Sequence, residues 1–268
     1  MLRDPYQTDE WAKLKGEHGY RTFRSGNTYI YVKDILVGRF VDIQYPNDPQ
    51  ATIDEALEEI GPSFVQLLND PQYSGHVFTP RGREHRKTSF KVALDRSVTQ
   101  LWENLKKQNR NAIRQAERKG CEFRVGTLAD DFEQFYDIYH KVAESKGFVP
   151  LSRRIIHRVF RSPLSKTCIV SVHDKPASVA MVLHSDSVAR FWYGAGSPQF
   201  YEFRPSNFLH WNIMLAAKSR GCLYYDLDVA SPESIFKPSF GAQSYPQQSM
   251  VWGSATGRLI KRLTSILR

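Results

Sequence analysis

Residues 167–193 read TCIVSVHDKPASVAMVLHSDSVARFWY, and three strand-like runs follow one another closely in this segment. Three runs in it, at 167–172, 178–184 and 188–193, are rich in apolar and β-branched residues, which is typical of strands. The short segments between them carry Asp, Pro and Ser, which are common turn residues. Strands joined by such short turns pair antiparallel, so the sequence predicts an antiparallel meander.

Downstream of the meander, the chain adds a strand by another route. Residues 206–220 have the pattern of a helix that ends at Gly221, and residues 223–227 form a further strand-like run. A strand that follows a helical crossover lies parallel to its neighbour, so we expect a locally parallel pair. Upstream, the pattern predicts a helix over 98–120, a strand over 122–125, a helix that stops at Gly147 and another over 152–160.

The N-terminal third has a mixed pattern. We expect a helix over 10–17, strands over 28–32 and 36–44, and a second helix with an apolar face from Ile53 to Leu68. A strand over 75–79 follows, and residues 81–91 are interpreted as a connection between two halves. A last strand over 248–252 precedes a helix with a stripe from Leu259 to Leu267, which either packs onto the body or docks on a membrane.

Composition bounds the class of protein. The chain has 268 residues, 41% of them hydrophobic, which is enough to bury a sizeable core. Its formal net charge of +9 favours a polyanionic partner such as nucleic acid, a nucleotide-linked substrate or an anionic membrane, against the alternative of a merely basic protein.

Cysteine usage and hydropathy predict the compartment. Cys121, Cys168 and Cys222 are odd in number and widely spaced, so we interpret them as packed thiols of a cytoplasmic protein. The stretch from Met1 to Pro5 has no apolar signal core, and no segment approaches the roughly 20 apolar residues of a membrane span. Any membrane contact is therefore expected to be peripheral.

The helix expected over 98–120 has one apolar and one basic side. The basic side is either solvated surface or a contact for phosphate or RNA. The cations that form it are Lys106, Lys107, Arg110, Arg114 and Arg118.

A second candidate site follows the parallel strand. The run from Tyr224 to Asp228 leads within a few residues to Phe236 and Lys237. A ring and an ammonium presented together suit a nucleotide, because its base stacks on the ring and its phosphate is attracted to the cation. Asp226 and Asp228 end the strand there, and either one could orient an attacking amine or form a structural hydrogen bond.

The familiar catalytic signatures are absent from the sequence. It contains no zinc-protease helix motif, no paired Cys-x-x-Cys, no Gly-x-Ser-x-Gly elbow and no phosphate loop. His184 and His210 lie among apolar residues and are interpreted as packed. We therefore expect no metal site and no bound cofactor.

The order of elements resembles the GNAT acyltransferase fold. The resemblance implies an α/β class with an α+β mixed sheet, in two GNAT-like halves that are each mostly antiparallel with flanking helices. We expect a shortened N-terminal half over 1–94, a C-terminal half over 95–245, and a closing strand and helix over 246–268. Residues 197–206 lack the glycine turn that holds acetyl-CoA pyrophosphate in that fold, which disfavours acetyl-CoA.

Several motifs resemble the Fem family, whose members transfer an amino acid from aminoacyl-tRNA to the peptide of a cell-wall precursor. They are the Trp11–Lys15 helix, Tyr45–Pro46, the Arg110–Ala116 segment, Trp192–Ser197, Tyr225–Leu227, and Phe236–Lys237 with Phe240–Gly241. Asp228 and Val229 stand where the family usually has two glycines.

The resemblance implies roles for individual residues. Phe236 and Lys237 would meet the charged 3′ end of the tRNA, with Lys237 also offsetting negative charge on the tetrahedral intermediate. Lys13 or Lys15, together with Tyr193, would contact phosphates of the acceptor. Arg153 is a further candidate for such a contact.

Aminoacyl transfer needs no catalytic dyad, because an aminoacyl ester is already activated and positioning lowers the barrier. The sequence leaves two alternatives open: an acyl-CoA-dependent N-acyltransferase on the same fold, and a non-catalytic RNA-binding module that uses the basic helix. It does not identify the amino acid, the acceptor or the oligomeric state.

Overall fold

The structure is a computed structural model that describes residues 4–35, 38–79, 81–231 and 233–253. The chain divides into two compact units, of which the first runs to Ser89 and includes the C-terminal stretch from Tyr245, and the second spans Phe90–Ser244. The described strands form a mixed eleven-stranded sheet in the order β1-β2-β3-β4-β11-β5-β10-β9-β8-β7-β6. Strands β5 (Arg83–Ala93) and β11 (Gln243–Gly253) contribute residues to both units.

The first unit combines strands and helices around an apolar core. The strands are β1 (Arg21–Ser25), β2 (Thr28–Ile35), β3 (Gly38–Gln44) and β4 (Phe64–Asn69), and the helices are α1 (Asp9–Glu17), α2 (Gln50–Ile60) and α3 (Pro71–Ser74). Strands β3 and β4 pair parallel, whereas β4 and β11 pair antiparallel. Successive β2 side chains alternate, so Ile30 and Val32 join the apolar core with α2 while Tyr31 meets Lys15 of α1.

The second unit carries the predicted meander. Its strands are β6 (Cys121–Gly126), β7 (Ser165–Val172), β8 (Lys175–His184), β9 (Val188–Gly196) and β10 (Tyr224–Ala230). Strands β6 to β9 pair antiparallel in sequence order, and β10 pairs parallel to β9. Both predictions from the sequence, the meander and the parallel strand after a helix, are therefore confirmed.

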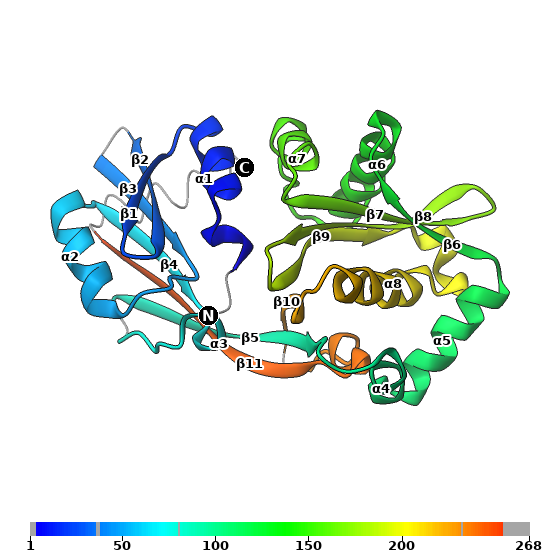
Figure 1. The fold of residues 1–268 in the computed structure, drawn as a ribbon. Coiled ribbons are helices and arrows are strands. Elements are labelled where there is room, and N and C mark those ends of the chain that lie inside the picture. Colours follow the sequence, from blue (N-terminus) through cyan, green and yellow to red (C-terminus); the bar gives the residue numbers. More distant parts are fainter. Residues whose placement is uncertain (1–3, 36–37, 80, 232, 254–268) are drawn as a thin grey trace. The chain divides into compact units, whose positions relative to one another are not determined.

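Helices cover both faces of the strands of this second unit. They are α4 (Val98–Asn104), α5 (Lys107–Arg118), α6 (Ala129–Lys146), α7 (Arg153–Phe160) and α8 (Pro205–Ser219), with short 3-10 helices η2 (Pro198–Phe203) and η3 (Lys237–Phe240). Helices α6 and α7 lie on one face, α8 lies on the other, and α5 packs along α8 (Figure 1). Helix α8 is buried over most of its length because it lies between the sheet and α5.

Three expectations for the N-terminal part were wrong. The helix predicted from Ile53 to Leu68 ends at Ile60, where Gly61 takes the left-handed conformation, and Phe64 begins strand β4. Residues 75–79 form no strand, since they follow the short helix α3 without regular structure. Residues 81–91, expected as a connection, lie largely in strand β5.

The single helix predicted over 98–120 is two helices. Leu105 and Lys106 have extended backbones with ψ of 141° and 145°, which ends α4 and begins α5. The guanidinium of Arg110 turns back to the carbonyls of Glu103 (2.8 Å) and Leu105, and so satisfies groups that the end of α4 leaves unpaired.

Among the described residues, no helix is both long and apolar enough to cross a bilayer. The C-terminal helix expected beyond residue 253 lies outside the described part of the chain.

Candidate functional site

The site begins where strands β9 and β10 stop pairing. Their parallel register covers three residue pairs and ends at Asp226 opposite Arg190. These two side chains form a fully buried ion pair, with Nη2 of Arg190 3.1 Å from Oδ2 of Asp226. The second oxygen of Asp226 accepts a hydrogen bond from the backbone N–H of Asp228 at 2.7 Å. Asp226 is therefore a structural residue that fixes the end of β10.

The ammonium of Lys237 is held at this same strand end. It donates hydrogen bonds to the carbonyls of Leu227 and Val229, at 2.5 and 2.6 Å. Burial lowers the pKa of Lys237, while Asp228 and Asp226 act in the opposite direction. The cation predicted from the sequence is thus fastened beside Asp228.

Phe236, the residue before Lys237, belongs to an aromatic cluster. The ring of Phe236 packs edge-on against His210 and Phe240, with centroid distances of 5.4 and 5.2 Å. His210 is buried, and its Nδ1 lies 2.7 Å from the hydroxyl of Tyr225. Burial, assisted by the nearby Lys237, lowers the pKa of His210 to about 3, so the imidazole is neutral at physiological pH. The cluster holds Phe236 in place while leaving 36% of it exposed.

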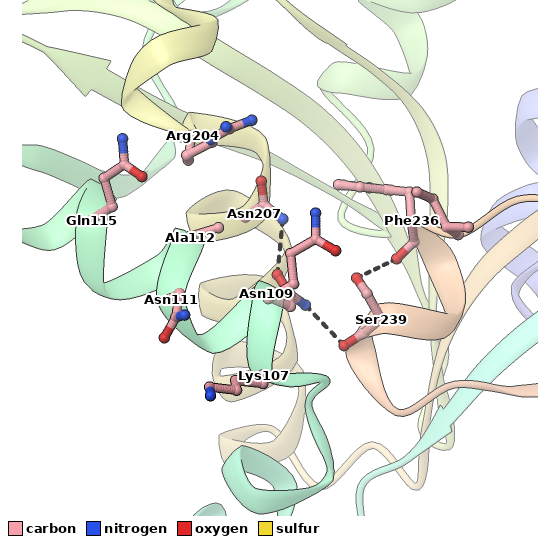
Figure 2. Close-up of a pocket in the computed structure, with 11 residues that line it drawn as sticks. Lys107, Asn109, Asn111, Ala112, Gln115, Arg204, Asn207, Phe236 and Ser239 are labelled. Atoms are coloured by element: carbon pink, nitrogen blue, oxygen red, sulfur yellow. Dashed lines mark hydrogen bonds between the residues drawn. The ribbon is translucent and has the colours of Figure 1, made fainter.

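Phe236 lines a cavity of about 790 Å³. The wall is built by α5, the start of α8, and η3 with the two residues before it (Figure 2). The lining residues are Lys107, Gln108, Asn109, Asn111, Ala112, Gln115, Arg204, Asn207, Ile235, Phe236 and Ser239. The cavity therefore presents two cations, several carboxamides and one exposed ring.

Hydrogen bonds of the Asn109 carboxamide join the three walls. The Nδ2 of Asn109 donates to the carbonyl of Ser239 at 3.1 Å, and its Oδ1 accepts from Nδ2 of Asn207 at 2.8 Å (Figure 2). Asn109 is 1% exposed, so these bonds form away from competing water. The cavity is consequently built in advance of any ligand.

The cations of the cavity come from the starts of two helices. Lys107 is the first residue of α5, and Arg204 directly precedes α8 with a left-handed φ of 59°. Both side chains belong to exposed residues. Positive charge near helix N-termini attracts an anion, and the neighbouring Phe236 ring offers a face to a planar group. A nucleotide has both features.

The structure separates the cations of the predicted basic side. Lys107 lines the cavity, whereas Arg110 caps α4 and Arg114 lies over the Trp102 ring at 5.3 Å. Lys106 lies in the break between the helices, and Arg118 is exposed at the end of α5. The five cations therefore do not form one continuous face.

The residues expected to contact the acceptor occupy different surroundings. In the first unit, Lys15 pairs with Asp42 at 2.6 Å, and Lys13 is exposed. In the second unit, Arg153 pairs with Glu133, and the ring of Tyr193 packs against Tyr139. Neither Tyr193 nor Arg153 is among the residues that line the cavity.

Sequence reasoning missed Asn109, Asn207 and Arg204, whereas Asn111 and Gln115 lie within the Arg110–Ala116 motif. Asn109 and Asn207 are 98 residues apart, and neither belongs to a motif with known chemistry. The run Gln108-Asn109-Arg110-Asn111, which is poor in apolar residues inside an amphipathic helix, was the available signal.

Comparison with known proteins gives a family match over part of the chain. Residues 103–234, which lie within the second unit, match the family model described as acetyltransferase (GNAT) domain. Over this segment the chain is thus similar to a GNAT acetyltransferase domain. A comparison with curated proteins gave no match.

Among solved structures, FemX is similar to this chain with a TM-score of 0.72 at 12% identity, over 98% of this chain and 95% of FemX. The C-terminal domain (DUF2156) of a putative lysylphosphatidylglycerol synthetase from Agrobacterium fabrum has a TM-score of 0.65 at 11% identity, over 97% and 93%. L-PGS from Bacillus licheniformis has a TM-score of 0.63 at 12% identity, over 96% and 97%. At these identities the likeness establishes the fold.

Proposed function

We propose that this protein transfers an amino acid from aminoacyl-tRNA to an amine of a peptide acceptor, either a peptidoglycan precursor or a small peptide. The reaction forms an amide bond without the ribosome. The Fem-like motifs of the sequence, the GNAT fold and the likeness to FemX and L-PGS support this proposal.

The observation that carries the proposal is the cavity beside Phe236. Its exposed ring suits the terminal base of an RNA, and Lys107 and Arg204 suit the phosphates that precede that base. The carboxamides of Asn111 and Gln115 add hydrogen-bonding groups along the same wall. A single-stranded RNA end has this combination of stacking faces and regularly spaced negative charges.

Lys237 supplies the electrostatic part of the chemistry. Two of the three N–H donors of its ammonium are used by the carbonyls of Leu227 and Val229. We expect the third to face the carbonyl oxygen of the aminoacyl ester, where negative charge develops as the amine attacks. A fixed cation at that point lowers the barrier without having to reorganise.

Transfer is tested with a pool of radiolabelled aminoacyl-tRNAs and candidate acceptors, with ribonuclease treatment as the control. The acceptors include phosphatidylglycerol, because one similar structure is named as a putative lysylphosphatidylglycerol synthetase. This lipid carries hydroxyl groups and no amine, so a labelled ester of it would contradict the proposed amine acceptor. We expect labelled amide product that ribonuclease pretreatment abolishes. Binding of the tRNA with a steep salt dependence but without transfer would instead indicate an RNA-binding module.

Two variants test the site directly. Phe236→Ala is expected to weaken tRNA binding by the roughly 1–3 kcal/mol that stacking on one base contributes, whereas Phe148→Ala, at a 42% exposed ring, leaves binding unchanged. Lys237→Met keeps an aliphatic side chain of similar length and is expected to lose most transfer activity. The control Lys141→Met, at an exposed lysine, is expected to keep its transfer activity. Near-normal turnover of Lys237→Met would contradict the proposal.

The family match favours one second candidate, an acyl-CoA-dependent N-acyltransferase, because the matching model is described as an acetyltransferase domain. Saturable CoA binding and transfer from an acyl-CoA, insensitive to ribonuclease, would identify that activity.

Three further expectations belong to the same proposal. The segments 1–94, 95–245 and 246–268 would be a shortened GNAT-like half, a complete GNAT-like half and a closing element. The protein would act in the cytoplasm and touch membranes peripherally at most. Localisation of a tagged chain and fractionation with vesicles test these expectations.

A further inference from the structure

Asp228 occupies an unusual place in the second unit. It lies two residues beyond Asp226, where β9 and β10 no longer pair, and its backbone has a left-handed φ of +64°. That conformation costs a residue with a Cβ about 1–2 kcal/mol relative to right-handed backbone, and glycine avoids the cost. An aspartate is nevertheless held there by its N–H bond to Asp226.

The two carboxylates at this strand end differ in access. The side chain of Asp226 is 0% exposed, and its two oxygens bond the guanidinium of Arg190 and the N–H of Asp228. The side chain of Asp228 is 40% exposed, and the nearest Arg190 nitrogen, Nη1, is 4.0 Å from its Oδ1. A substrate can therefore reach the carboxylate of Asp228 and not that of Asp226.

Charged groups surround Asp228 from three elements. Arg190 approaches from β9, Asp226 precedes it on β10, and the Lys237 ammonium from η3 bonds the carbonyls on either side of it. Neutral His210 of α8 faces Lys237. Burial raises the pKa of Asp228, Asp226 adds to that rise, and Arg190 and Lys237 oppose it. A carboxylate with a raised pKa is a stronger base at neutral pH.

We propose that Asp228 is the catalytic base of the transfer, acting on the attacking nitrogen, with Arg190 and Lys237 as the groups that position it. This inference rests on the proposed function, since it assigns a further role within the same site. A second base near Lys237, His210, is directed at the hydroxyl of Tyr225 and is buried, so it does not serve this purpose.

The proton transfers balance over one cycle. The lone pair of the neutral acceptor amine forms the new C–N bond, and the C=O electron pair moves onto the carbonyl oxygen. Asp228 takes one proton from the nitrogen as that bond forms. The electron pair on the carbonyl oxygen then re-forms the C=O bond as the C–O bond to the ribose breaks. The electron pair of the broken bond leaves with the ribose oxygen, which receives the proton from Asp228. Amine and ester thus become amide and alcohol, and Asp228 returns to its ionised form.

Asp228→Asn and Asp228→Gly test the assignment, because both residues tolerate left-handed backbone and remove the base. Asp174→Asn is the matched control, since Asp174 also has a positive φ, of 61°, in the β7–β8 turn. We expect kcat to fall about 100-fold or more in both Asp228 variants. The Kd for aminoacyl-tRNA and the urea midpoint should stay near those of the wild type, and Asp174→Asn should retain full activity.

Two readouts separate a base from a structural residue. In the wild type, kcat/KM should fall as the pH drops through the pKa of Asp228, and this acid limb should disappear in Asp228→Asn. Added formate should restore part of the activity of Asp228→Gly by replacing the carboxylate. A kcat of Asp228→Asn within about threefold of the wild type, or a decrease with an unchanged acid limb and no formate rescue, would overturn the assignment.

The assay is run with aminoacyl-tRNA and with acyl-CoA as donors. Wild-type transfer from acyl-CoA alone refutes the proposed function, while the comparison of Asp228→Asn with the wild type still decides the base. A wild-type chain that transfers from neither donor overturns both.

Discussion

Removing the carboxylate of Asp226 should destabilise the second unit far more than removing an exposed one. Arg190 and Asp226 are 1% and 0% exposed, so the pair lies in a medium of low dielectric. Asp226→Ala removes the carboxylate that pairs with the buried guanidinium of Arg190. Such a loss costs about 3–5 kcal/mol when no partner remains. Because Asp228 still lies 4.0 Å away, we expect the lower part of that range, about 3–4 kcal/mol.

The assay is urea denaturation followed by hydrogen exchange of peptides from residues 90–244, which reports the second unit by itself. Asp137→Ala is the control, because Asp137 and Lys141 form an exposed pair at 2.8 Å with 61% and 70% of their side chains exposed. An exposed i,i+4 pair contributes about 0.3–0.5 kcal/mol, so this variant should hardly change the midpoint.

A double variant separates charge from packing. Replacing both partners, as Arg190→Met with Asp226→Leu, removes the stranded charge and should be more stable than Asp226→Leu alone. Equal costs for Asp226→Ala and Asp137→Ala, or a double variant no more stable than the single one, would refute this account of the ion pair.

Three further outcomes follow from other residues. Burial lowers the pKa of His184 to about 4 and of His210 to about 3, so the unfolded chain binds more protons below pH 6.5. The free energy of unfolding should therefore fall as the pH drops from 6.5 towards 4, by roughly 1 to 1.5 kcal/mol per pH unit for each histidine. His184→Gln should about halve the slope of a plot of the urea midpoint against pH. Gly241→Ala should lower the melting temperature more than Gly221→Ala, because both glycines have positive φ but a Cβ at Gly241 would lie 2.9 Å from the carbonyl oxygen of Asn104; equal losses would contradict this. The thiols of Cys121, Cys168 and Cys222 are buried with raised pKa, to about 12 for Cys168, so alkylation at pH 8 should follow unfolding in urea rather than precede it.

Much of the second unit could be predicted from the sequence because local signals agree there. Strands β7 to β9 have apolar runs separated by turn residues, and α6 and α8 are each followed closely by a glycine, Gly147 and Gly221. These signals act over a few residues, so they survive without knowledge of the tertiary contacts.

The errors in the predicted helices arose where the apolar periodicity continues past the end of a helix. Leu105 is buried at the end of α4 and Ile113 is buried on α5, so an apolar stripe continues through the interruption and no glycine or proline marks it. Phe64 and Leu67 likewise fit a helical spacing with Ile60, although Gly61 and Pro62 were a stop signal.

The candidate site was predictable in part. Phe236 was identified from its neighbourhood in the chain, and it does line a cavity. The partners that build that cavity come from α5, α8 and η3, and a hydrogen bond such as that between Asn109 and Asn207 leaves no trace in local sequence. Only the fold brings such residues together.

The hydrogen bonds in the cavity fix which atom of the Asn109 and Asn207 carboxamides donates and which accepts. Asn109 donates through its nitrogen to Ser239 and accepts through its oxygen from the nitrogen of Asn207, so the orientation of both amides is fixed. The oxygen of Asn207 is then the end that remains for a partner, and an oxygen of this kind can only accept. A base that carries an exocyclic amino group, as adenine and cytosine do, satisfies this oxygen, whereas the oxo groups of uracil and hypoxanthine face it with like polarity.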